Sequence, residues 1–333
     1  MPGGLIVRAP NHLGDLVLAL PALEAAGGAD VMVLRSLSPL LELAGLRGRI
    51  LPLDRGARGF LAAARRLRRG RYERGVLLPP SFSSALLFAA GGVAERRGTA
   101  TDGRAVLLTE PVDPAELAGC HRSVAYFRLV TGRLPARPLV PHLPVPEPFL
   151  ARWRELAGAA SRPVIGIFPG SKASSRRWDL TRHAELARRL AARGARVVVF
   201  GGPEERELTA VVAGDWAFDA GGRTDLGLLA AGLAACDVLV TNDSGPMHLA
   251  AAVGTPTISL WGAGDPNVTG PLGEGHLILR HPELPCVPCV KNECPRRGRG
   301  YVLEEAEREC LRLIQVADVE AVLEARGTLR GSP

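Results

Sequence analysis

The sequence has no long apolar run and few aromatic residues. No stretch of about 18 or more uncharged apolar residues occurs, so no segment has the length of a transmembrane helix. The chain runs from Met1 directly into a strand-like segment, without a basic leader or a cleavage site, and we expect a cytoplasmic protein. Only 5% of the residues are aromatic and the basic residues are scattered, so nucleic-acid binding is not expected.

Two common nucleotide-binding motifs are also missing. The turn after the first predicted strand, at residues 10–15, does not have the Gly-x-Gly-x-x-Gly spacing of dinucleotide-binding folds. The chain also has no Gly-x-x-x-x-Gly-Lys-Ser/Thr loop. The sequence therefore has neither the usual signature of hydride transfer nor that of ATP hydrolysis.

The chain has the size and composition of two globular domains. It has 333 residues, of which 47% are hydrophobic and 23% charged, and its formal net charge is +7. A positive charge of this size is compatible with an anionic ligand or an anionic membrane surface.

Apolar runs of strand length alternate with helical patterns along the whole chain. Strands are predicted at residues 5–9, 31–34, 50–53 and 75–78, and then at 164–168, 196–201, 238–241 and 257–261. Helices are predicted at residues 16–26, 60–69, 180–193, 204–212, 226–235 and 246–253. A proline-rich stretch from residue 134 separates the two sets. The pattern predicts an α/β protein with two doubly wound parallel sheets, whose domains face each other across a cleft.

The first strand leads into a turn with Asn11, His12, Gly14 and Asp15 before a helix. Asp15 has two interpretations, and both stay open on spacing alone. An aspartate at a helix start commonly caps the helix. A carboxylate there can also act as general base on a substrate hydroxyl, with His12 as a weaker competitor.

Three further turns follow predicted strands of the second half. Ser171, Lys172 and Arg176 suit phosphate oxygens, although a solvated basic turn has the same composition. Glu204 and Glu205 begin a helix, either for dipole reasons or as a contact to ribose hydroxyls. The richest turn, residues 241–248, ends in a helix whose backbone N–H groups predict an anion site. Asp243 there would cap the helix or hold a sugar hydroxyl.

These turns resemble glycosyltransferase family 9, the ADP-heptose:lipopolysaccharide heptosyltransferases. The resemblance rests on PNHLGD at 10–15, LPAL at 20–23, TNDSGPMHLAA at 241–251 and GTP at 254–256. It implies a GT-B fold, with two Rossmann-like domains, and an inverting transfer from ADP-heptose to an inner-core lipopolysaccharide sugar without a catalytic metal. The acceptor is an anionic glycolipid, so peripheral contact with the inner membrane surface is expected. Another GT-B transferase or an epimerase that uses a UDP-sugar, or a non-catalytic nucleotide-sugar-binding protein, are the alternatives.

The resemblance also assigns domains and residue roles. It implies an acceptor domain at 1–133, a linker with a connecting helix at 134–160, a donor domain at 161–314, and a last helix at 315–330 that crosses back to the first domain. Asp15 matches the family's general base, in an acceptor loop with Asn11, His12 and Gly14. Asp243 matches a donor-sugar contact and Glu205 a ribose contact. The donor diphosphate is assigned to Ser171, Lys172, Arg176, Ser244, Gly245, Met247 and His248, with Arg176 where the family typically has lysine.

Four of the six cysteines lie late in the chain, at Cys286, Cys289, Cys294 and Cys310. Four thiols suffice for a tetrahedral zinc site, and Cys286-x-x-Cys289 has the spacing of metal ligands. The other gaps fit no standard zinc finger. A structural zinc ion and reduced or disulfide-bonded cysteines are therefore both retained as interpretations, and none of the four is expected to be catalytic.

Overall fold

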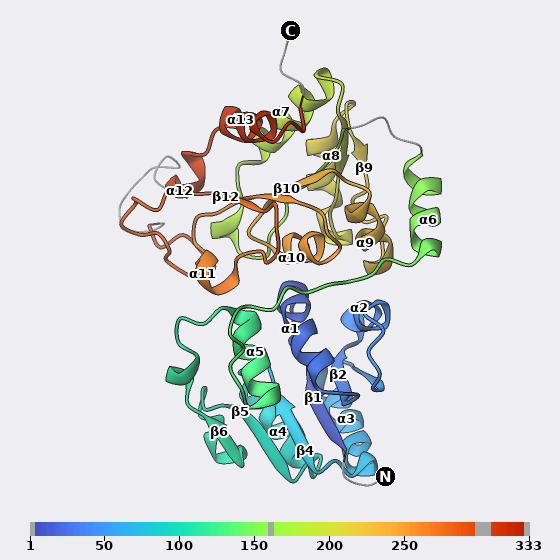
Figure 1. Ribbon diagram of the computed structural model, residues 1–333, viewed down its shortest axis with the longest axis vertical. Coiled ribbons are helices and arrows are strands. Elements are labelled where there is room, and N and C mark those ends of the chain that lie inside the picture. The colour runs from blue at the N-terminus through green and yellow to red at the C-terminus, as the bar shows by residue number, and fades with distance from the viewer. Residues whose placement is uncertain (1–3, 159–162, 297–307, 330–333) are drawn as a thin grey trace. The chain divides into compact units, whose positions relative to one another are not determined.

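A computed structural model describes residues 4–158, 163–296 and 308–329. The chain divides into two compact units, Met1–His142 and Leu143–Pro333. The division falls within the proline-rich stretch, where fixed φ angles and missing N–H groups keep the backbone out of helix and sheet. Figure 1 shows the elements of each unit in chain order.

The first unit has a parallel sheet of six described strands. Its spatial order is β3-β2-β1-β4-β5-β6, and every pairing is parallel. The strands are β1 (Leu5–Arg8), β2 (Asp30–Leu34), β3 (Ile50–Leu53), β4 (Arg74–Leu77), β5 (Glu95–Thr99) and β6 (Glu110–Val112). The helices are α1 (Leu13–Ala25), α2 (Ser38–Leu43), α3 (Gly56–Gly70), α4 (Phe82–Ala90) and α5 (Arg122–Thr131). This is the strand order of a Rossmann-type sheet. The order in which successive strands are added reverses between β1 and β4, although all strands run in the same direction.

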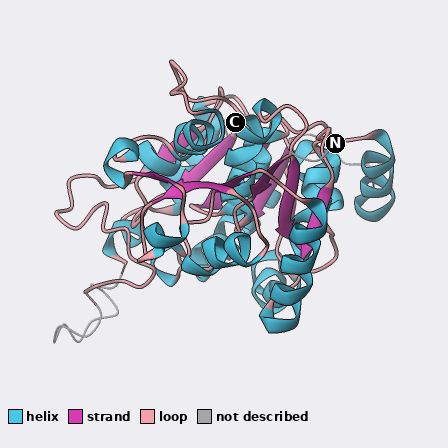
Figure 2. Cartoon of the chain, turned by 90° about the horizontal axis from the view of Figure 1, so that it is seen from below, coloured by secondary structure: helices cyan, strands magenta, loops and turns pink. Residues whose placement is uncertain are grey.

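The second unit repeats the same plan. Its strand order is β12-β11-β10-β7-β8-β9, again wholly parallel. The strands are β7 (Val164–Phe168), β8 (Arg196–Val199), β9 (Phe218–Asp219), β10 (Val238–Asn242), β11 (Thr257–Leu260) and β12 (Leu277–Leu279). The helices are α6 (Glu147–Ala157), α7 (Leu180–Ala192), α8 (Arg206–Ala213), α9 (Leu226–Ala234), α10 (Gly245–Ala252), α11 (Pro266–Thr269), α12 (Glu309–Arg312) and α13 (Val316–Ala325). Figure 2 shows the strands enclosed by helices.

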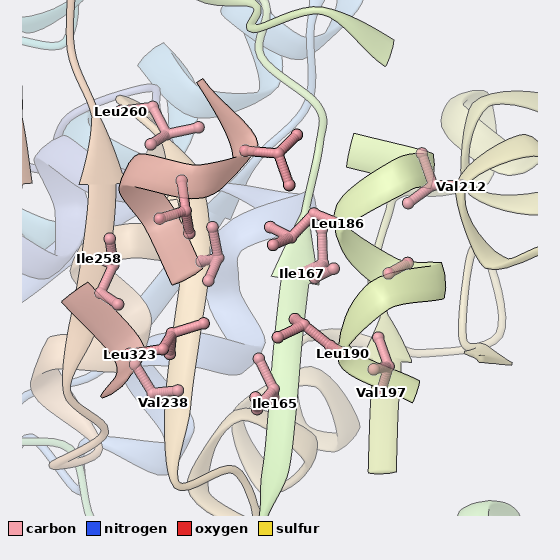
Figure 3. Packing of buried hydrophobic residues seen from close by; sticks show 14 of the residues in the cluster. Ile165, Ile167, Leu186, Leu190, Val197, Val212, Val238, Ile258, Leu260 and Leu323 are labelled. Atoms are coloured by element: carbon pink, nitrogen blue, oxygen red, sulfur yellow. The ribbon is translucent and has the colours of Figure 1, made fainter. Parts of the chain in front are cut away.

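The central strands, such as β7, β10 and β11, bury both faces, as parallel strands covered by crossover helices do. In the second unit, alternate residues of one strand face the same helix layer. Ile165 and Ile167 of β7 belong to one buried cluster with Leu186 and Leu190 of α7 (Figure 3). Burying these side chains is the main favourable contribution to the stability of the unit.

The last described helix completes this cluster. Val316, Val319 and Leu323 of α13 are buried in it, and Glu320 forms an ion pair with Arg189 of α7 at 3.1 Å. The family resemblance implied that this segment crosses back to the first domain. In the structure, the apolar face of α13 packs in the buried core of the second unit.

Several elements escaped the sequence analysis. Strands β5, β6, β9 and β12 lie outward in the two sheets and are short or polar, so they lack an apolar run. Helices α2, α4 and α5 were also not predicted. Helix α1 begins at Leu13, three residues before the predicted start, and α10 begins at Gly245.

Candidate active site

The turns at the carboxyl ends of β7 and β10 are held together by Asn242, which is fully buried. Its Oδ1 accepts a hydrogen bond from the backbone N–H of Trp178 at 3.0 Å. Its Nδ2 donates to the carbonyl of Pro169 at 2.7 Å. Because parallel strands 7 and 10 are neighbours, one amide side chain can join both ends of the loop 169–178 to the end of β10. No role for Asn242 was predicted from the sequence.

Arg176 and Asp243 meet at this edge of the sheet. Arg176 Nη1 lies 3.2 Å from Asp243 Oδ2, and the Asp243 side chain is 3% exposed. Burial raises the pKa of Asp243 to about 6, against the lowering effect of Arg176. Within the described structure, Asp243 Oδ2 and Arg176 Nε are buried without a hydrogen-bond partner. Buried polar atoms of this kind are rare in folded proteins, and strain, a catalytic role, or a bound water or ion commonly accounts for them.

Helix α10 begins beside this pair. Its N-cap is Ser244, whose side chain makes no capping bond, so Asp243 does not cap the helix. The Met247 side chain is fully buried and its N–H donates to the carbonyl of Ser244 at 3.2 Å. Met247 is therefore buried as a whole residue at this turn. Gly245 is half-buried at the first turn, while His248 is 6% exposed.

Glu205 is turned toward the end of β7. Its Oε2 accepts a hydrogen bond from the backbone N–H of Gly202 at 2.8 Å. A Cβ at Gly170 would lie 1.8 Å from Glu205 Oε1, so only glycine leaves room for this carboxylate. One carboxylate oxygen of Glu205 thus caps the first turn of the helix, and the second oxygen lies against the turn after β7.

Ser171 and Lys172 occupy the same turn in different environments. Ser171 is buried and its carbonyl accepts a hydrogen bond from Arg177 Nε at 2.7 Å. Lys172 is exposed. The turn therefore presents the exposed ammonium group of Lys172, and the exposed Arg177 holds its backbone through the Ser171 carbonyl.

Asp15 of the first unit lies in the first turn of α1. The N-cap of α1 is His12, which makes no side-chain capping bond, so Asp15 is not the cap. Tyr126 of α5 donates its hydroxyl to Asp15 Oδ1 at 3.0 Å, and Arg122 Nε lies 3.7 Å from the same oxygen. The Asp15 side chain remains 31% exposed. It is therefore oriented by two neighbours and still open to a substrate hydroxyl.

Arg8, the last residue of β1, holds the loop before α1 in place and is 3% exposed. Arg8 donates to Asn11 Oδ1 and, at 3.2 Å, to the carbonyl of Met32. Burial lowers the pKa of Arg8 to about 10, so the side chain stays cationic at neutral pH. Asn11 thus has its side-chain oxygen engaged within the loop, while His12 is exposed and Gly14 is buried.

Arg8, Arg122 and Tyr126 were missed in the sequence. The four-residue spacing of Arg122 and Tyr126 places both on one face of a helix, but that helix was not predicted. Arg8 ends an apolar strand, where a buried cation was not expected.

The four late cysteines line one small cavity with Ser175, Gly262 and Ala263. None of the four is in a disulfide. Burial raises the pKa of Cys310 to about 11, and the neighbouring thiols Cys286, Cys289 and Cys294 add to the effect. In the described part of the chain, no three His, Cys, Asp or Glu side chains are already placed as a metal-binding group.

Comparison with known proteins shows the family. The sequence profile of glycosyltransferase family 9 (heptosyltransferase) matches residues 60–298. Lipopolysaccharide heptosyltransferase 2 of Escherichia coli K12 is 30% identical over 304 residues, covering 83% of this chain and 87% of that protein. Lipooligosaccharide heptosyltransferase 2 of Haemophilus influenzae is 28% identical, covering 83% of this chain and 88% of that protein.

The structural comparison agrees. The structure of E. coli ADP-heptose lps heptosyltransferase II superimposes with a TM-score of 0.80 at 27% identity, covering 97% of this chain and 98% of that one. Among the described residues, no helix is both long and apolar enough to cross a membrane. With two Rossmann-type sheets and a profile match over most of its length, the chain belongs to glycosyltransferase family 9, the heptosyltransferase family.

Proposed function

We propose that this protein moves a heptose from ADP-heptose to the inner core of lipopolysaccharide, with inversion at the anomeric carbon. The observation that carries the donor half of the proposal is the buried ion pair of Arg176 and Asp243, in which Arg176 Nε and Asp243 Oδ2 have no hydrogen-bond partner among the described residues. The names of the similar heptosyltransferases support heptose as the sugar and lipopolysaccharide as the acceptor.

The donor site follows from the charges around β7 and β10. Arg176 and Lys172 supply positive charge for the diphosphate, and the N-terminus of α10 adds backbone N–H groups at Gly245. The buried carboxylate of Asp243 then accepts a hydrogen bond from a sugar hydroxyl, which would give Asp243 Oδ2 a hydrogen-bond partner. Glu205 Oε1 is left for the ribose. The fixed positive groups stabilise the charge that develops on the departing ADP.

The acceptor half depends on Asp15. It takes the proton from an acceptor hydroxyl, which attacks the anomeric carbon on the face opposite ADP. Tyr126 and Arg122 hold the carboxylate in place, and no metal is assigned to the chemistry. Asp15→Asn and Asp15→Ala should lower kcat by at least about a hundredfold while the Kd for ADP stays unchanged. Turnover at the wild-type rate in either variant would remove Asp15 from the mechanism.

The nucleotide is tested separately by titrating ADP and UDP against the protein, followed by a mass-spectrometric screen of ADP- and UDP-sugars. ADP should bind more tightly, and only an ADP-heptose should yield a glycosylated acceptor. Tighter binding of UDP would instead favour a transferase or epimerase that uses a UDP-sugar. Binding of ADP-heptose without turnover of any acceptor would leave a nucleotide-sugar-binding protein.

Peripheral contact with an anionic membrane surface completes the proposal. The outward face of α3 carries Arg58, Arg65 and Arg69 around the exposed Leu61, and the helix has no acidic residue. Such a basic face with one apolar side chain suits a lipid headgroup layer.

Co-sedimentation tests this contact with phosphatidylglycerol and phosphatidylcholine vesicles. Arg65→Glu should weaken binding to the anionic vesicles about fivefold or more, because each basic residue contributes about 1 kcal/mol there. Arg188→Glu on α7 makes the same change in net charge and is the matched control. Equal losses in the two variants would assign the effect to net charge and exclude α3 as the contact.

A further inference from the structure

The four late cysteines come from two separate segments that meet at one cavity. Cys286, Cys289 and Cys294 lie after β12, and Cys310 lies on α12. The described segment from residue 281 to 296 contains no helix or strand. An irregular segment this long buries little apolar surface, so it needs another source of order.

The backbone around the cavity is arranged to bring sulfur atoms inward. The N–H of Arg308 donates to Cys294 Sγ at 3.4 Å. Gly262 lies so close to Cys310 that a Cβ there would be 2.4 Å from its Sγ. Val290, which follows Cys289, has φ of 53°, a genuine outlier for a β-branched residue. Its N–H donates to the carbonyl of Ala263 at 2.8 Å, so the strained turn is anchored to the wall of the cavity.

The surroundings suit a negatively charged thiolate cluster. Arg296 and Arg308 both line the cavity, and Arg296 also forms an ion pair with Glu309. Four thiolates around a divalent ion carry two net negative charges, which nearby guanidinium groups stabilise. The cysteines are half-buried, so an ion can reach them from solvent.

We propose that Cys286, Cys289, Cys294 and Cys310 bind one thiophilic metal ion, zinc or iron, as a tetrathiolate site. Four sulfur ligands are the donor set that such ions prefer. Metal–sulfur bonds of about 2.3 Å require the thiols to converge further than they do in the described structure, by rotation of the cysteine side chains and contraction of the segment. The cavity between them provides the space for that movement.

The ion would position a part of the proposed donor site. The carbonyl of Lys291 accepts a hydrogen bond from Ser175 Oγ at 2.5 Å, and the carbonyl of Asn292 accepts from the N–H of Ser175 at 3.2 Å. Ser175 directly precedes Arg176. Ordering the cysteine segment therefore orders the turn that presents Arg176, a consequence that rests on the proposed function.

The first experiment measures the metal itself. The full chain is purified without added metal, and zinc and iron are quantified per protein by mass spectrometry. About one equivalent of either metal is expected, and the same measurement tells the two apart. Cys289→Ser should lose the metal, whereas Cys120→Ser, which removes a cysteine of the first unit, should retain it. Wild-type protein with less than about a tenth of an equivalent, or equal retention in both variants, would overturn the site.

A second experiment does not depend on which variant folds. The metal is removed from wild-type protein with a mercurial reagent, and the cysteines are then freed with a thiol reductant. The metal-free protein is titrated with Co²⁺ alone. If thiolates are the ligands, we expect an intense sulfur-to-cobalt charge-transfer band. Its absorbance should stop rising when about one equivalent of Co²⁺ has been added. Absence of that absorption contradicts the proposal even if the protein is active.

For the positioning role, the stripped enzyme should show a higher KM for the nucleotide sugar with kcat little changed. Loss of kcat alone would reject that role and leave the metal site intact.

Discussion

Asp15 shows how the environment of a single side chain can suit it to catalysis. The hydroxyl of Tyr126 points at its carboxylate from a buried position, with 5% of the tyrosine exposed. Burial, followed by the neighbouring Asp15, raises the pKa of Tyr126 well above 10. The phenol therefore stays protonated at neutral pH and can donate to Asp15.

Removing that hydroxyl tests the arrangement. Tyr126→Phe should lower kcat about fivefold with the KM for the nucleotide sugar unchanged, because one orienting hydrogen bond of about 1 kcal/mol is lost. Tyr72→Phe removes a buried hydroxyl that donates to Asp30 in the same unit, and is the matched control. Steady-state kinetics on both variants decide the matter. A similar drop in kcat for both would point to general destabilisation of the unit.

The titration of Asp243 predicts a pH dependence of stability. Its folded-state pKa is about 6, above the ordinary value of 3.8, because burial disfavours the charged form. Its favourable contribution is thus complete below pH 3.8 and is lost as the pH rises through 6. Asp243→Asn should therefore gain stability relative to wild type between pH 4 and pH 7, by up to about 3 kcal/mol.

Urea unfolding at several pH values measures this difference. Asp179→Asn provides a control of opposite sign, because hydrogen bonding by Thr181 lowers the pKa of Asp179 in the folded state. Stability owed to Asp179 is present above its ordinary pKa and lost as the pH falls. A free-energy difference for Asp243→Asn that does not change with pH would show that the folded-state pKa of Asp243 is not raised.

At the scale of elements, the segments that follow β10 and β11 are tightly packed against each other. A Cβ at Gly264, in the loop after β11, would lie 2.1 Å from Asp243 Oδ2 and 2.9 Å from the ring of Trp261. Both neighbours are buried and cannot swing away. The glycine is therefore required for the loop to close over Asp243.

Gly264→Ala should displace Asp243 and cost about 1 to 3 kcal/mol of unfolding free energy. We also expect a loss of ADP affinity of about tenfold or more, since the pair with Arg176 is disturbed. Gly4→Ala, whose Cβ would meet its nearest neighbour only at 3.9 Å, is the control for the substitution itself. Calorimetric titration and urea unfolding report the two effects. Unaltered values for both would refute the close packing.

At the scale of the whole molecule, all four tryptophans lie in the second unit, at Trp153, Trp178, Trp216 and Trp261. Tryptophan fluorescence therefore reports the unfolding of that unit alone. Trp178 is part of the turn beside Arg176 and donates its indole N–H to the carbonyl of Ile314 at 2.9 Å.

Ligand binding to that unit should shift its fluorescence transition. ADP at about a hundred times its Kd should raise the unfolding free energy by about 2.7 kcal/mol, by mass action on the folded state. Arg176→Met should abolish most of the shift, and Asp15→Asn should keep it in full. An equal shift in wild type and Arg176→Met would remove Arg176 from the donor site.

Much of the fold could be predicted from the sequence because parallel strands are apolar on both faces. The strands β1, β7, β10 and β11 each appear as short apolar runs, and the turns after them locate the candidate site residues. Outer strands such as β5, with the sequence ERRGT, carry no such signal. Their pairing is decided by neighbours distant in the chain.

The sequence by itself determined the alternation of the central strands with helices, the family, and the turns that carry Asp15, Arg176 and Asp243. Local periodicity and turn residues are sufficient for these, because they depend on neighbours along the chain. Only the tertiary structure decided that Tyr126 holds Asp15, that Arg176 pairs with Asp243, and that four cysteines share one cavity. The first two contacts join residues far apart in sequence, and the third brings Cys310 to the segment that carries the other three cysteines. Their distances are set by the packing of the sheets and helices between them.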